Sequence, residues 1–189
     1  THNFDDDILS ASRNMAKRYR CNTSHGQKIE NYALQIFDAM KKFHGLGTRE
    51  RLLLQIASIL HDCGKFISLR DSSACAYNII MATEIIGLSH AEREIVAEVV
   101  RCNLDAFRYG EGSIRAGKLT AMLRLANAMD RSHHGRLDDG KLQVKGNKLI
   151  ISTSYAGNLA LETMAVEDKA DFFEEMFGIR PEIRQKRRV

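Results

Sequence analysis

The stretch from Thr48 to Lys65, TRERLLLQIASILHDCGK, decides the fold class. Thr48 can start a helix, and the apolar residues that follow recur at the spacing of one helical face. These apolar residues are Leu52, Leu53, Ile56, Ile59 and Leu60. The pattern predicts a core helix that ends near Gly64 and presents a polar run, His61-Asp62-Cys63-Gly64-Lys65, at its C-terminal end.

The same helical periodicity continues on both sides of this segment. Further helices are predicted at residues 5–19, 24–40 with Ser24 as the cap, 73–86 with Gly87 as the stop, from the capping box at 89–92 onward, and at 119–129. The chain has a single proline, Pro181, and scarce proline favours long helices because proline interrupts them.

After about Arg136 the pattern changes from helical to alternating. Residues 141–145 and 148–151 flank the turn pair Gly146-Asn147, which is typical of a β-hairpin. A strand is expected at 159–164, a helix at 169–177 that stops at Gly178, and an edge strand at 179–183, where Pro181 is tolerated. The sequence therefore predicts a mainly α protein, with a helical domain at 1–136 and a small α+β subdomain at 137–189.

The charge and the cysteines limit the function classes. The net charge is +4, and basic residues gather between Arg101 and Arg131 and in the tail at 184–188, which permits a phosphorylated or polyanionic partner. A solvated basic surface explains the same excess. The four cysteines show no zinc-knuckle spacing and are expected to be reduced thiols in a cytoplasmic protein. No apolar run or signal peptide indicates a membrane segment, and the start at Thr1 leaves open a longer natural protein.

Four polar residues fall where the helical pattern predicts buried positions: His25, His61, Asp62 and Asp130. A carboxylate on an apolar face is costly unless it is paired or binds a cation, so the set is a candidate divalent-metal site. Each residue also has a plainer explanation. His25 could be a core histidine bonded to a carbonyl, Asp62 a loop residue, and Asp130 a partner of Arg131 or Arg124.

In chain order these residues resemble the H…HD…D signature of the HD superfamily of metal-dependent phosphohydrolases, and residues 61–65 match its HDxGK form. Residues 123–133, LRLANAMDRSH, are similar to a stretch of the exopolyphosphatase and guanosine pentaphosphate phosphatase proteins, the Ppx/GppA family. The resemblance implies an HD-domain-like helical bundle and covers only the C-terminal half of such proteins. Their phosphatase active site lies in an N-terminal actin-like region that has no counterpart in this sequence.

The resemblance also implies roles for individual residues. His25, His61, Asp62 and Asp130 would hold one divalent metal ion (Mn, Mg, Fe, Co, Ni or Zn), and Asp62 would also orient or deprotonate its water. Lys65, Arg131 and His133 would bind the phosphate of a phosphorylated small molecule or polyphosphate. Lys65 would also be catalytic, because it would neutralise phosphate charge in the transition state. Relatives carry further histidines where this sequence has Cys75-Ala76 and Cys102-Asn103, so one metal at most is expected.

Three functions follow as alternatives. The chain is a metal-dependent phosphohydrolase; or it is a non-catalytic module that binds polyphosphate or nucleotides, or forms a homodimer, beside an upstream phosphatase domain; or it is a helical scaffold with a buried polar cluster.

Overall fold

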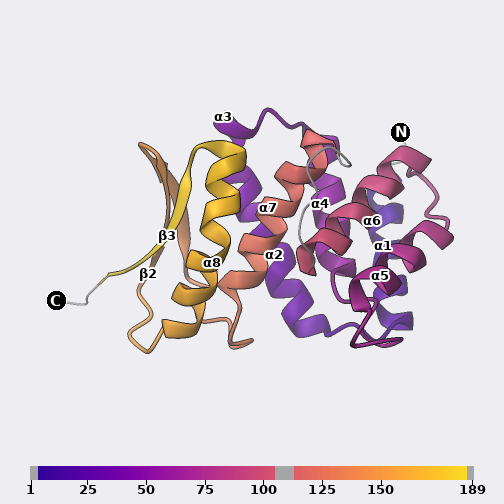
Figure 1. Cartoon of the computed structure of the whole chain (residues 1–189), viewed down its shortest axis with the longest axis horizontal. Coiled ribbons are helices and arrows are strands. Elements are labelled where there is room, and N and C mark those ends of the chain that lie inside the picture. The colour runs from indigo at the N-terminus through magenta and orange to yellow at the C-terminus, as the bar shows by residue number, and fades with distance from the viewer. Residues whose placement is uncertain (1–3, 105–112, 187–189) are drawn as a thin grey trace.

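The computed structural model describes residues 4–104 and 113–186, and within them the chain is mainly helical (Figure 1). The eight helices of this part are α1 (Phe4–Arg18), α2 (Thr23–Ala39), α3 (Lys41–His44), α4 (Thr48–Leu60), α5 (Ser72–Ala82), α6 (His90–Leu104), α7 (Ile114–Met129) and α8 (Ala160–Phe177). Its strands are β1 (Lys141–Lys145), β2 (Lys148–Thr153) and β3 (Arg180–Gln185). Residues 187 and 188 of the basic tail lie outside this description.

Helix α4 is the central helix of the bundle. Its leucines and isoleucines are buried on nearly every side, which is typical of a helix surrounded by other helices. It packs against α1, α2, α6 and α7 (Figure 1). The predicted start at Thr48 is confirmed, and the polar run from His61 follows the helix directly. His61 and Asp62, the HD pair, therefore lie in the interior of the protein at the end of this core helix.

Several helix boundaries differ from the predictions. Helix α4 ends at Leu60 rather than near Gly64, and α7 begins at Ile114 rather than at residue 119. Asn22, not Ser24, caps α2, because the Asn22 side chain accepts a hydrogen bond from the His25 amide. Helix α5 ends at Ala82 rather than at residue 86. The capping box is confirmed: Ser89 and Glu92 each bond the other's backbone amide at the start of α6.

The predicted hairpin is confirmed as β1 and β2, joined by the turn at Gly146-Asn147. The strand expected at 159–164 is wrong, because this segment is the first part of α8. The buried residues of α8 are Glu162, Val166, Ala170 and Phe173, which share one helical face. The helix predicted at 169–177 therefore begins earlier, at residue 160.

Helix α8 connects two parallel strands. β3 pairs with β2 in parallel, so the sheet order is β1-β2-β3 and β3 is an edge, where Pro181 is tolerated. In Figure 1, α8 lies between this sheet and α7. The same hydrophobic core runs from the bundle to Leu149, Ile151 and Phe173. The division into two domains near residue 136 stays a prediction. None of the helices within 4–104 and 113–186 has the length and apolar content needed to cross a membrane.

Candidate functional site

Three helix ends meet at the residues of the H…HD…D pattern. His25 lies in the first turn of α2, His61 and Asp62 follow α4, and Asp130 caps the C-terminus of α7. The His25 and His61 rings lie 5.5 Å apart between centroids, and His25 Nδ1 lies 2.6 Å from Asp130 Oδ2. All four side chains are buried. The fold therefore gathers residues that are up to 105 positions apart in the sequence.

Asn22 ties two of these segments together. Its side-chain oxygen accepts the His25 amide at 3.1 Å, which fixes the start of α2. Its own amide donates to Asp62 Oδ2 at 3.3 Å. One residue thus sets the position of the α2 terminus relative to the HD pair.

Gly64 explains how the turn after α4 fits against α5. A Cβ on Gly64 would lie 1.9 Å from the Ser72 carbonyl oxygen and 2.8 Å from the Ala76 amide nitrogen. Only glycine allows so close a backbone approach. This contact holds the turn that carries His61 and Lys65 at its ends.

Asp130 is held by two donors. Oδ2 bonds His25 Nδ1, and Oδ1 accepts the Gly135 amide at 3.0 Å. Burial raises the pKa of Asp130, but the hydrogen bonds from His25 and Gly135 outweigh it, so the pKa lies below its ordinary value. The ring of His133, a residue with φ of +61°, stacks on His25 at 3.6 Å. Asp130 is therefore ionised, and its loop covers one face of the His25 ring.

His61 and Asp62 keep unused binding atoms. His61 Nδ1 lies 2.8 Å from the Ser58 carbonyl oxygen and so donates its proton there. Burial lowers the pKa of His61, so the imidazole is neutral and its Nε2 carries a lone pair. Among the described residues neither His61 Nε2 nor Asp62 Oδ1 has a hydrogen-bond partner, although both are buried. Such orphaned buried atoms call for a ligand or water.

The four residues fit a divalent metal in type but not in arrangement. Neutral imidazole and carboxylate are suitable metal ligands. The lone pairs of His61 Nε2 and Asp62 Oδ1 have no hydrogen-bond partner among the described residues. However, His25 and Asp130 bond each other, and in the described part of the chain no three His, Cys, Asp or Glu side chains are close enough to share an ion. In this geometry the four side chains do not share one ion, and the metal-ligand role of the set stays a prediction.

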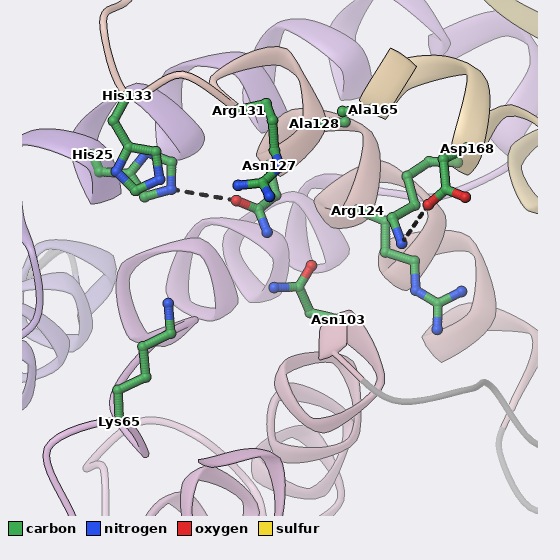
Figure 2. Close-up of a pocket in the computed structure, with 11 residues that line it drawn as sticks. His25, Lys65, Asn103, Arg124, Asn127, Ala128, Arg131, His133, Ala165 and Asp168 are labelled. Carbon is green, nitrogen blue, oxygen red and sulfur yellow. Dashed lines mark hydrogen bonds and ion pairs between the residues drawn. The ribbon is translucent and has the colours of Figure 1, made fainter. Parts of the chain in front are cut away.

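A cavity of about 370 Å³ opens beside this cluster (Figure 2). His25 and His133 form one wall. Residues of α6, α7 and α8, Lys65 from the turn after α4, and Arg131 just after α7 supply the rest. Four cationic side chains line it: Lys65, Arg124, Arg131 and Lys169. Among the described residues of the lining the single carboxylate is that of Asp168, which pairs with Lys169 at 3.3 Å. The cavity is therefore lined mainly by positive charge.

His133 adds little to this charge. Burial and the neighbouring His25 lower the pKa of His133, so its imidazole is neutral at pH 7. Arg124 is fixed by structural contacts, since its Nε donates to the Cys102 carbonyl and its guanidinium lies over the Phe172 ring. Within residues 4–104 and 113–186 no carboxylate pairs with Lys65 or Arg131. These two side chains are the cations that remain available to a ligand.

The structure brings the predicted substrate residues Lys65, Arg131 and His133 into one cavity, while His61, Asp62 and Asp130 lie outside its lining. Sequence reasoning did not assign Asn103, Asn127 or Lys169 to the site. A signal existed for Asn103. It continues the buried stripe of α6, whose valines are Val96, Val99 and Val100, and a polar residue on such a stripe indicates a functional position.

The sequence of this chain is similar to those of known proteins. Residues 9–167 match the family model described as Ppx/GppA phosphatase, domain III. The chain is also 24% identical over 157 residues to a guanosine-5'-triphosphate,3'-diphosphate pyrophosphatase of Photobacterium profundum. That match covers 80% of this chain and 32% of the relative, so the chain spans about a third of the relative's length. The family match extends over the helical bundle and the first part of α8, with every residue of the cluster and most of the cavity inside it. The chain therefore belongs to the Ppx/GppA phosphatase family, to whose domain III it corresponds.

Proposed function

We propose that this chain binds phosphorylated ligands, such as polyphosphate or a nucleotide, in the cavity beside His25. The observation that carries the proposal is the charge of the lining, where Lys65 and Arg131 face the cavity without a carboxylate partner among the described residues. Phosphate oxygens pair well with guanidinium and ammonium groups.

The cavity supports binding more directly than hydrolysis. Asp62, the residue expected to orient or deprotonate a water, lies outside the lining, and one of its oxygens is bonded to the Asn22 amide. A phosphate held by Lys65 and Arg131 would therefore lie beside the HD pair. On this proposal Lys65, Arg131 and His133 bind substrate, and the imidazole of His133 contributes a hydrogen bond rather than charge.

The test is calorimetric titration of the chain with inorganic tripolyphosphate at low and at physiological salt. Lys65→Gln and Arg131→Gln should each weaken binding about 5- to 30-fold, since a charge-assisted contact contributes roughly 1–2 kcal/mol. The matched control is Lys141→Gln, which removes an exposed lysine of β1 that does not line the cavity, and this variant is expected to bind as the wild type does. Unchanged affinity in both cavity variants would contradict the proposal.

Metal-dependent phosphohydrolysis is the second candidate. The buried and unpartnered His61 Nε2 and Asp62 Oδ1 favour it, because a cation would satisfy both atoms. An ion held by these residues, with His25 and Asp130 after their mutual bond opens, would polarise a phosphoryl oxygen. The departures at Cys75 and Cys102 favour one ion rather than two.

Elemental analysis of protein purified without chelator tests the second candidate. About one equivalent of a transition metal, lost in His61→Ala, supports the metal site. Phosphate release with Mn, Mg, Co, Ni or Zn is then measured on the same preparation. A metal-free protein that stays folded and releases no phosphate would contradict phosphohydrolysis, and phosphate binding would remain as the proposed function.

The similarity to a guanosine-5'-triphosphate,3'-diphosphate pyrophosphatase supports phosphorylated guanosine compounds as one ligand class. Because the chain spans about a third of that relative, a phosphatase domain beside it belongs to the same proposal. We also propose a cytoplasmic location and a homodimer. Light scattering of the purified chain would test the homodimer.

A further inference from the structure

Asn103 is the feature of the cavity that a simple phosphate site does not explain. It lies near the C-terminal end of α6, is only 5% exposed, and lines the cavity. Neither its Oδ1 nor its Nδ2 has a hydrogen-bond partner among the described residues, although both atoms are buried. In Figure 2 its carboxamide points up into the space below Asn127. A native protein rarely leaves both halves of a buried amide unpaired, so this side chain calls for a ligand or a water molecule in the cavity.

The chemistry of the carboxamide restricts that ligand. Phosphate oxygens only accept hydrogen bonds at neutral pH, except for one proton on a terminal group, so they satisfy Nδ2 and leave Oδ1 without a donor. Oδ1 and Nδ2 together require a donor beside an acceptor on one rigid edge. A nucleobase offers this arrangement, and the adenine N6 amino group beside N7 is the pair that asparagine binds with two hydrogen bonds.

We propose that Asn103 recognises the base of a nucleotide, with adenine as the best match, while the cations of the same cavity hold its phosphates. The inference rests on the proposed phosphate-binding function and names the ligand within it. In Figure 2 the Asn103 amide stands between Lys65 on one side and Arg124 on the other, so a base there has cationic side chains on both flanks.

The size of the cavity agrees with a single small nucleotide. Its volume of about 370 Å³ lies near the lower end of the range of roughly 300–1,000 Å³ typical of small-molecule pockets. Asn127 lies on the same side of the cavity, but its Oδ1 is 3.3 Å from His25 Nε2 and so is already engaged. Asn103 therefore carries the base contact.

The experiment compares ADP with inorganic pyrophosphate, which has no base, by calorimetric titration of the full chain. ADP should bind about 10-fold more tightly than pyrophosphate, since a bidentate base contact gives roughly 5- to 150-fold discrimination. Asn103→Leu should abolish this difference and leave the affinity for pyrophosphate unchanged. GDP, CDP and UDP form the other arms, and a stronger preference for one of them would overturn the assignment of adenine.

The outcomes separate this inference from the proposed function. If pyrophosphate binds and ADP binds no more tightly, base recognition is overturned while phosphate binding stands. If neither binds, the proposed function itself fails. Should Asn103→Leu not fold, the side-chain amide resonance of Asn103 in the wild type decides: it should shift with ADP and not with pyrophosphate, and an unchanged resonance at saturation with ADP would refute the contact.

Discussion

Replacing Gly64 by alanine tests whether the backbone contact between the HD turn and α5 holds the site together. In the native structure a Cβ at this position would lie 1.9 Å from the Ser72 carbonyl oxygen and 2.8 Å from the Ala76 amide nitrogen. Real Cβ atoms essentially never approach a heavy atom within 3.0 Å. The atoms in the way belong to the backbone of α5, so no side-chain rotation relieves the clash.

The expected cost follows from this geometry. Overpacking a buried site costs typically about 1–3 kcal/mol, and a clash with helix backbone should reach the upper end. For a chain of this size each kcal/mol lowers the melting temperature by roughly 2–4 °C, so Gly64→Ala should lower it by roughly 6–12 °C. Because Lys65 follows the altered residue, we also expect weaker binding of tripolyphosphate.

The assay is thermal unfolding followed by circular dichroism, with Gly26→Ala as the matched control. Gly26 lies inside α2, and a Cβ there would meet nothing within 4 Å. Alanine is favoured over glycine in a helix by about 0.5–1 kcal/mol, so the control should melt at the same temperature or higher. A Gly64→Ala protein as stable as the wild type would refute the role of this contact.

Three further predictions concern stability and reactivity. Asn22→Ala removes the α2 cap and should lower the free energy of unfolding by about 1 kcal/mol in urea titrations, and an unchanged value would show that the cap is dispensable. The hydrogen bond from Arg49 lowers the pKa of Glu92 from 4.5 to about 2, so its contribution is present above pH 4.5 and is lost as the pH falls toward 2. Glu92→Gln should therefore melt below the wild type at pH 7 and converge with it near pH 2, and a constant gap would contradict this. Burial raises the pKa of both Cys63 and Cys102 to about 12, so in native protein at pH 8 these thiols should react with iodoacetamide about 100-fold or more slowly than in unfolded protein, as peptide mass mapping would reveal.

The parts of the fold that the sequence predicted correctly depend on local periodicity. The stripe of α4 follows directly from the spacing of its leucines and isoleucines, and it placed His61 at a buried helix end before any tertiary information was used. The same reasoning put Asp130 on the buried side of α7. The strand predicted at 159–164 is wrong because a short apolar run does not distinguish a strand from a helix. The packing of α8 against α7 and the sheet favours the helix.

The cavity could be predicted only in part. Lys65, Arg131 and His133 follow the motif residues closely in sequence, so the resemblance pointed to them. Asn103 and Lys169 come from α6 and α8, and their approach to the cavity depends on how these helices pack against α7. Such packing angles are set by long-range contacts that no local pattern encodes. The hydrogen bond between His25 and Asp130 was likewise not predicted. The sequence indicated Arg131 or Arg124 as the partner of Asp130.

The most direct test of phosphate binding in the cavity is a nuclear magnetic resonance titration of isotope-labelled protein with inorganic tripolyphosphate. The proposed site predicts saturable shifts that are largest at Lys65, Arg131 and His133. Shifts confined to the basic tail at 184–188, or small shifts spread over all surface lysines and arginines without saturation, would contradict it.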